Sequence, residues 1–236
     1  MSDHTLWYLE NIDVTHIFCP RKMEHEHDAL RHVHFGKGEY IYLPDEDADK
    51  VYFLTDGCVR LGTMNEEGKE VTKAILAKGE VFGELALMDE GKRRDFASAI
   101  EDTTVCILTV DEMRHLMREH SGLNLFLMKL MGSRILEMEN RLESLVFKDS
   151  RSRIIELVYD YAVKHGRTVG AEIHVPNFIR HKDIAQLTAT SRQTVTSVLN
   201  DLRNQQLIDF NRKELVIRQP EKMQEEIDKN ALRHSW

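Results

Sequence analysis

The sequence predicts an α+β protein with three parts: an N-terminal antiparallel β-roll, a long helix and a C-terminal winged helix-turn-helix. Three patterns support this prediction. Short β-branched and aromatic segments fill residues 30–110, an apolar heptad repeat follows, and a helix-turn-helix pattern lies near residue 190. We expect the β-roll within residues 1–118 and the long helix with a hinge within 119–149. The winged unit is expected within 150–220 and a charged tail of unknown role over 221–236.

The composition is that of a protein with real apolar cores and no membrane partner. The 236 residues suffice for two modest domains, and 42% of them are hydrophobic. We find no apolar run of about 18 residues and no basic segment followed by an apolar one at the N-terminus. Cys19, Cys58 and Cys106 are odd in number and form no CxxC pair. This cysteine usage favours a reducing compartment, so we expect a cytoplasmic protein.

The β-roll is predicted from short strand-like segments separated by glycines. Each segment is rich in Val, Ile, Leu, Tyr or Phe, and glycines lie in the turns between them. Many short strands with regular turn signals indicate an antiparallel roll or barrel. The expected strands are 40–43, 51–54, 59–61, 71–76 and 105–108.

The long helix carries apolar residues at alternating spacings of three and four, which is a heptad seam. Strong helix formers surround the seam, and charged residues flank it. Such a seam either packs on the helix's own β-domain or pairs with the same helix of a second copy, and its length favours the homodimer. The seam residues are Met128, Met131, Ile135, Met138, Leu142 and Leu145.

The helix-turn-helix is predicted over residues 181–203. Residues 181–187 form a short first helix, 188–190 a tight turn, and Ser191 is a suitable N-cap for the second helix. Val195, Val198, Leu199 and Leu202 make one apolar stripe on that second helix. Two strands around a polar turn, 207–210 and 215–218, then complete a winged arrangement.

The opposite face of the second helix has the residue types that read DNA. Arg can bond guanine with two hydrogen bonds, and Gln can do the same with adenine. Residues 151–218 contain 11 Lys and Arg against 7 Asp and Glu, whereas the rest of the chain has 21 against 33. A basic excess confined to this segment is typical of a DNA-binding module. The predicted DNA contacts are Ser191, Arg192, Gln193, Thr194, Thr196, Ser197, Arg212 and Lys213, of which Ser191, Thr194, Arg212 and Lys213 suit phosphates.

The chain has the predicted order β-roll, long helix and winged helix-turn-helix. It also contains the Phe82–Leu87 segment FGELAL, then Arg94, and the segment SRQTV from Ser191. In these features it resembles the Crp/Fnr superfamily of bacterial transcription regulators. The resemblance covers about residues 30–218. It implies a cytoplasmic homodimer that binds palindromic promoter DNA and contacts RNA polymerase. It also implies that the β-roll senses a small effector and that the long helix relays the signal to the recognition helices. Relatives commonly have Glu where Gln193 stands, which predicts an altered base preference at that position.

In the cyclic-AMP-binding members of this superfamily, the resemblance assigns Gly83, Glu84, Leu85 and Arg94 to a phosphate-binding cassette. Asp95 stands where those members have Ser, and a carboxylate about 4 Å from a phosphate costs on the order of 4 kcal/mol at an effective dielectric constant of about 20. Met138 and Glu139 replace a Thr-Ser pair that contacts the adenine. Three hypotheses therefore stay open: cyclic AMP, another small anionic effector, and a β-roll that binds none, in which Glu84 and Arg94 pair with each other.

The sequence also bears on three other classes of function. The sequence has no nucleophile elbow, P-loop or HExxH motif, so we expect no enzyme. A cyclic-nucleotide-binding-like module that regulates a protein partner without specific DNA binding is one alternative, and a metal, haem or redox sensor of the same fold is another. His25, His27, His32 and His34 invite a metal hypothesis, but no third ligand lies at a diagnostic interval, and we predict no metal site.

Overall fold

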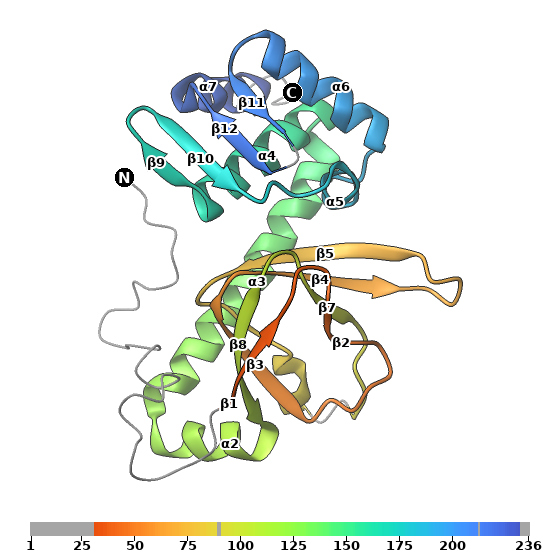
Figure 1. Ribbon diagram of the computed structural model, residues 1–236, viewed down its shortest axis with the longest axis vertical. Helices are drawn as coiled ribbons and strands as arrows, with labels where there is room; N and C mark the ends of the chain where they lie inside the picture. The colour runs from red at the N-terminus through yellow and green to blue at the C-terminus, as the bar shows by residue number, and fades with distance from the viewer. Residues whose placement is uncertain (1–30, 89–90, 212, 232–236) are drawn as a thin grey trace. The chain divides into compact units, whose positions relative to one another are not determined.

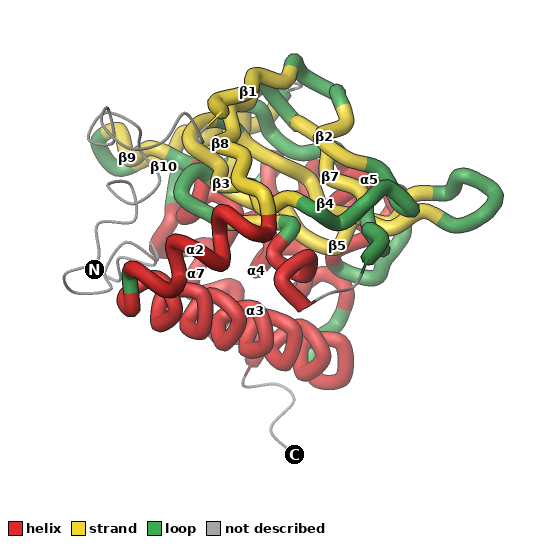
Figure 2. The backbone as a smooth tube through the Cα atoms, turned by 90° about the horizontal axis from the view of Figure 1, so that it is seen from below, coloured by secondary structure: helices red, strands yellow, loops and turns green. Residues whose placement is uncertain are grey.

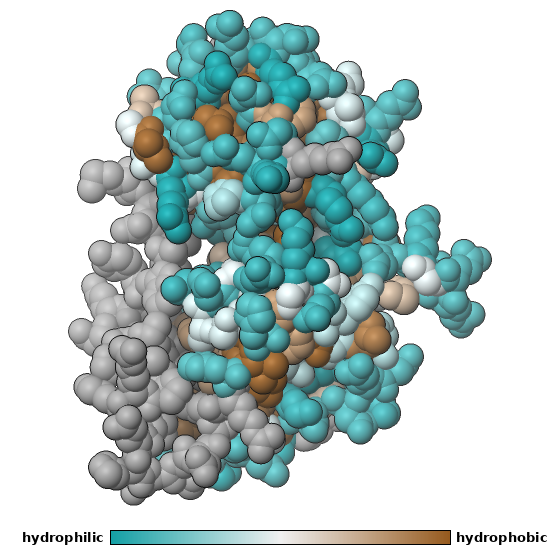
Figure 3. Space-filling model, viewed as in Figure 1, coloured by the Kyte–Doolittle hydropathy of each residue, from teal (hydrophilic) through white to brown (hydrophobic). Residues whose placement is uncertain are grey.

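The structure is a computed structural model that describes residues 31–88, 91–211 and 213–231. Its contacts divide the chain into two compact units, 1–134 and 135–236, and the division falls inside helix α3, Ser121–Phe147 (Figure 1). In the described part of the chain, no helix combines the length and the apolar character that crossing a bilayer requires. Hydrophilic side chains cover most of the face seen in Figure 3, and smaller apolar patches lie among them.

The first unit is built on two four-stranded antiparallel sheets, which confirms the predicted β-roll. One sheet has the strand order β1-β8-β3-β6 and the other has the order β2-β7-β4-β5. The five strands named from the sequence are all present, and β1, β6 and β7 are further strands within the same predicted stretch. The bounds are β1 Arg31–Phe35, β2 Tyr40–Tyr42, β3 Lys50–Asp56, β4 Cys58–Met64, β5 Glu70–Ala77, β6 Val81–Phe82, β7 Phe96–Ala99 and β8 Thr103–Thr109, with the 3-10 helix η2 at Glu84–Met88.

Strand β3 shows how the sheets and helices share the apolar residues. Val51 and Phe53 belong to the core cluster that also holds buried residues of α2, Val110–Glu119, and of α3. Tyr52 and Leu54 belong to the cluster formed by strands of both sheets. Because successive side chains of a strand point to opposite faces, this continuous apolar run serves two cores at once.

Helix α2 was not predicted, although its start has a recognisable sequence signal. Thr109 and Glu112 form a capping box: Thr109 Oγ1 accepts from the Glu112 amide at 3.2 Å, and Glu112 Oε2 accepts from the Thr109 amide at 2.6 Å. Figure 2 shows α2 beside the strands β3 and β8, with which it is in contact. The helix covers one side of the β-roll before α3 begins.

Within its described residues, the second unit contains a four-stranded antiparallel sheet of order β11-β12-β10-β9 and four helices besides the end of α3. The predicted helix-turn-helix and the hairpin of the wing are confirmed, whereas the hairpin β9–β10 was not predicted. The bounds are α4 Ser150–His165, β9 Arg167–Val169, β10 Glu172–Pro176, α5 His181–Leu187, α6 Arg192–Asn204, β11 Ile208–Phe210, β12 Glu214–Ile217 and α7 Pro220–Ala231.

Two details mark the ends of this unit. Asp149 caps α4, and its Oδ1 accepts from the Ser152 amide at 2.7 Å. The expected tail includes α7, which packs against α4 and buries Met223 completely. The winged unit therefore extends beyond residue 220, because one apolar side chain holds the next helix to its core.

Candidate functional site

Helix α6 is amphipathic, and its inner face is fixed by the core of the second unit. Ser191 Oγ caps the helix by accepting a hydrogen bond from the Thr194 amide at 3.0 Å. The predicted apolar stripe is buried, as helical spacing requires: Val195, Val198, Leu199 and Leu202. Since these residues hold one face in place, the direction of the opposite face is determined.

The outer face of α6 is polar and lines one open surface hollow. The residues around this hollow are Arg192, Gln193, Thr196, Ser197 and Asn200. Four of them were predicted from the sequence. Asn200 was missed, although it lies four residues after Thr196 and therefore on the same side of the helix. A guanidinium, two amides and two hydroxyls offer the donors and acceptors that recognition of base edges needs.

His181, at the start of α5, is a further residue of this face that the sequence analysis missed. Its Nδ1 lies 3.0 Å from Thr196 Oγ1, and Thr196 Oγ1 also donates to the Arg192 carbonyl at 2.9 Å. Burial lowers the pKa of His181, and the charge of Arg192 lowers it further. His181 thus lies beside the outer face of α6 as a neutral group at pH 7.

The residues predicted to contact phosphates are distributed around this face. Thr194 is half-buried, and its Oγ1 lies 2.8 Å from Ser191 Oγ, so both hydroxyls belong to the helix cap. Lys213 is exposed in the turn between β11 and β12, where its amide donates to Asn211 Oδ1 at 2.7 Å. Arg212 lies outside the described residues.

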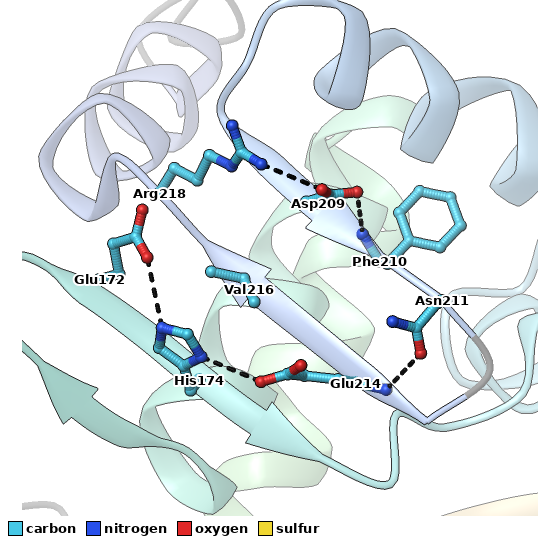
Figure 4. A pocket seen from close by; sticks show the side chains of 8 residues that line it. All are labelled: Glu172, His174, Asp209, Phe210, Asn211, Glu214, Val216 and Arg218. Atoms are coloured by element: carbon cyan, nitrogen blue, oxygen red, sulfur yellow. Dashed lines mark hydrogen bonds and ion pairs between the residues drawn. The ribbon is translucent and has the colours of Figure 1, made fainter.

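One face of the wing sheet carries a hollow of different character (Figure 4). His174 lies between two carboxylates, with Nδ1 2.9 Å from Glu214 and Nε2 3.2 Å from Glu172. The hydrogen bond with Glu214 does most to raise the pKa of His174, and the bond with Glu172 adds to it. Asp209 Oδ2 accepts from Arg218 at 3.0 Å in the same hollow. Three carboxylates disfavour contact with DNA phosphates here.

In the Phe82–Leu87 segment of the β-roll, Gly83 makes main-chain contacts and Glu84 forms an ion pair. Gly83 has φ +71°, and a Cβ there would lie 2.9 Å from both Arg93 Nη1 and Tyr52 Cδ2. Glu84 is buried and forms an ion pair with Arg134 of α3. Arg134 also donates to the Val81 carbonyl. Leu85 is exposed.

The pairing of Glu84 with Arg94, which belonged to one of the three open hypotheses, is therefore wrong. Arg134 takes the carboxylate because α3 packs on the same sheet as β6, a tertiary contact that the sequence pattern does not reveal. Arg94 is exposed, and the buried arginine of this segment is Arg93. Its Nη1 donates to the Gly83 carbonyl at 3.0 Å and its Nη2 to the Lys50 carbonyl at 2.5 Å.

Aromatic rings complete the surroundings of Arg93. Its guanidinium lies 4.5 Å from the ring centre of Tyr42 and 5.5 Å from that of Tyr52. Asp95 is half-buried, and burial raises the pKa of Asp95 more than the charge of Lys73 lowers it. The segment is thus occupied by the chain's own charged groups.

Comparison with known proteins identifies both units. A family model described as a cyclic nucleotide-binding domain matches residues 32–120, and one described as a Crp-like helix-turn-helix domain matches residues 152–226. The global nitrogen regulator of Synechocystis sp. is 32% identical over 189 residues, which are 79% of this chain and 84% of that protein. The chain belongs to the Crp/Fnr family. It is a transcription regulator and not an enzyme.

Other Crp/Fnr proteins extend the comparison. The cyclic AMP receptor protein of Thermus thermophilus is 33% identical over 175 residues, 74% of this chain and 77% of that one. A solved structure of a CRP-family transcriptional regulator from Thermus thermophilus superposes with a TM-score of 0.68 at 27% identity, covering 83% of this chain and 96% of that one. The predicted fold and family are thereby confirmed.

The predicted seam of this Crp/Fnr protein lies along α3. Met128, Ile135, Met138 and Leu142 are each more than half exposed, Leu145 is 40% exposed and Met131 is half-buried. Leu123, Phe126, Leu127 and Leu130 on another side of the helix are buried instead. Glu139 is exposed next to Met138. An apolar stripe of this length without cover in one chain is typical of an interaction surface.

The histidine hypothesis gains no support from the residues that the structure describes. His32 and His34 lie on β1, while His25, His27 and Cys19 fall outside the described residues. Among the described residues, no group of three His, Cys, Asp or Glu side chains is arranged to hold a metal ion.

Proposed function

We propose that this Crp/Fnr protein is a homodimeric, sequence-specific regulator that binds palindromic promoter DNA through α6. The observation that carries the proposal is the division of α6 into a buried apolar face and an exposed face with Arg192, Gln193 and Asn200. A helix presented in this way fits the major groove of B-DNA.

The outer face suggests a role for each side chain. Arg192, at the first turn, is proposed to read guanine with two hydrogen bonds, and Gln193 is proposed to read a neighbouring adenine. Thr196 and Ser197 offer hydroxyls to bases one turn further along the helix. Ser191, Thr194, Lys213 and Arg212 are proposed to contact the phosphate backbone, which sets register without reading sequence.

The dimer is proposed to form along the seam of α3, Met128 to Leu145. Burying an exposed apolar stripe contributes roughly 25 cal/mol for each Å² removed from water. Leu142→Glu places a carboxylate in that stripe and should convert the dimer to monomer in sedimentation velocity. Glu143→Gln, one residue away, is the matched control and should remain dimeric. A dimeric L142E protein would contradict this placement of the interface.

We propose that the β-roll responds to a small effector by way of the contact between Glu84 and Arg134. Any ligand that binds the Glu84 carboxylate must first displace Arg134, and Arg134 belongs to α3. This physical link would let ligand binding act on the long helix. Asp95 and the exposed positions of Arg94, Met138 and Glu139 depart from the cyclic-AMP pattern.

By family, the proposed place of action is the cytoplasm, and the further partner is RNA polymerase. Both follow from the role of a transcription regulator, which must reach the chromosome and the enzyme that reads it.

The experiment that tests DNA recognition is selection from a random pool of duplex DNA with the full-length protein. We expect a two-fold symmetric consensus whose half-sites are centred about 10 base pairs, or a multiple of that, apart. A pool that yields no consensus after repeated selection would contradict the proposal. A consensus without symmetry would contradict the dimeric mode of reading.

The effector hypothesis is tested by calorimetric titration of the full-length protein with cyclic AMP. Binding in the micromolar range would show that Asp95 and Met138 are tolerated, and Glu84→Gln should then weaken it. No heat and no thermal shift at millimolar ligand would exclude cyclic AMP and leave DNA recognition intact.

A further inference from the structure

Arg153, in the first turn of α4, connects two parts of the second unit that are distant in sequence. Its Nη1 donates to the carbonyl of Lys148, just after α3, at 2.6 Å. Its Nε donates to the carbonyl of Thr188, in the turn of the helix-turn-helix, at 2.9 Å. One half-buried guanidinium therefore bridges the end of the long helix and the turn that precedes α6.

The contacts on the α3 side make this end of the bridge stiff. Glu156, also on α4, accepts from Lys148 Nζ at 2.5 Å and from Ser144 Oγ at 3.3 Å. Lys148 is thus held through its side chain by Glu156 and through its carbonyl by Arg153. The junction of α3 and α4 is the place where the sequence suggests a hinge, yet these bonds fasten it.

The contacts on the turn side lead directly to the recognition helix. Thr188 is buried and closes α5, with its Oγ1 donating to the Ile184 carbonyl at 2.7 Å. Ala189 has φ +48°, a strained conformation that only the surrounding bonds can maintain. Ser191, which caps α6, follows two residues later. A shift of the Thr188 carbonyl would therefore change the direction in which α6 begins.

We propose that Arg153 is a positioning residue that sets the orientation of the recognition helix relative to the end of the dimer helix. The inference rests on the proposed function, since it presupposes two copies of α6 that read one symmetric site. In a dimer joined along α3, the angle between α3 and α6 decides the separation of the two recognition helices. Arg153 thereby determines which half-site spacing the dimer prefers, without contacting DNA.

The test compares half-site spacing preference in full-length variants. The duplexes are the selected consensus and two derivatives with one base pair added or removed between the half-sites. R153M removes both hydrogen bonds but keeps much of the side-chain volume. R153K keeps the charge, but its single ammonium group does not match the two-carbonyl geometry. R167M is the matched control, because it removes an exposed arginine of the same unit.

The spacing preference is the ratio of the affinity for the consensus duplex to the affinity for a duplex of altered spacing. We expect this ratio to fall about tenfold in R153M and R153K, a factor comparable with the loss of one or two hydrogen bonds. R167M should keep that ratio. It removes one positive charge, so its affinity should fall by the same factor for all three duplexes. A residue that merely stabilises the fold would lower the unfolding temperature without changing spacing preference.

Two results would overturn the inference. One is an unchanged spacing preference in R153M and R153K while the wild type discriminates between the duplexes. The other is an R153M variant that loses affinity for all three duplexes equally, as R167M does. A wild-type protein that discriminates between no sequences would instead refute the proposed function, and this inference with it.

Discussion

Two regions of this Crp/Fnr protein carry the residues singled out in its sequence, and they differ in how those residues are used. On α6 the predicted face is turned outward, and Arg192 and Gln193 are exposed. In the β-roll, Glu84 is bound by Arg134, and the arginine that faces inward is Arg93. The periodicity of a long amphipathic helix determines which side chains face outward. The arrangement of the short segment around Glu84 and Arg93 depends instead on the elements that pack against it.

The largest effect should come from the inner face of α6. Leu199 is fully buried, and Leu199→Ala should lower the free energy of unfolding by about 3 to 4 kcal/mol, through lost burial and the cavity left behind. Ser197→Ala, on the outer face, should change it by less than about 0.5 kcal/mol. Chemical denaturation followed by circular dichroism measures both, and equal losses would contradict the two-faced arrangement.

The next effect should come from the ion pair in the β-roll. Arg134→Met leaves the buried Glu84 carboxylate without this partner and should cost about 2 to 3 kcal/mol of stability, less than for a fully buried pair. Adding Glu84→Gln should recover part of the loss. If R134M is as stable as the wild type, Arg134 does not secure α3 to the β-roll.

The same contrast explains what the sequence could predict. The five strands named in the β-roll, the helix α6 and its buried stripe follow from periodicity, because one face of each element must enter a core. The pairing of Glu84 with Arg134 joins positions 50 residues apart, and no local pattern indicates it. Likewise His181 reaches Thr196 only because α5 packs against α6. The capping box of Thr109 and Glu112, in contrast, is a local pattern that the sequence does contain.

A smaller effect should appear on acidification, through His165. Burial, and to a smaller extent the charge of Lys164, together lower the pKa of His165 from 6.5 to about 3. The unfolded chain therefore binds this proton first, and stability is lost as the pH falls below 6.5. The loss should reach about 1.4 kcal/mol between about pH 7.5 and about pH 5.5. His165→Gln should remove this part of the pH dependence, and an unchanged slope would contradict it.

The smallest effect should have the opposite sign and come from His174 on the wing. The pKa of His174 is raised in the folded protein, so protonated His174 stabilises the folded state below pH 6.5. This stabilisation is lost as the pH rises through the pKa that His174 has in the folded protein. A titration followed by NMR should give a pKa above 6.5 for His174. Glu214→Gln should lower that pKa more than Glu172→Gln does, since the bond to Glu214 has the larger effect. The reverse order would show that Glu172 is the main partner.

Reading of base sequence by α6 can be tested with a double comparison of protein variants and DNA duplexes. The affinity for the selected duplex is measured against the affinity for the same duplex with the guanine opposite Arg192 replaced, in the wild type and in Arg192→Ala. The wild type should discriminate by about 1 to 3 kcal/mol, and the variant should bind both duplexes almost equally. A variant that keeps the full discrimination would contradict the account, because Arg192 would then not read the base.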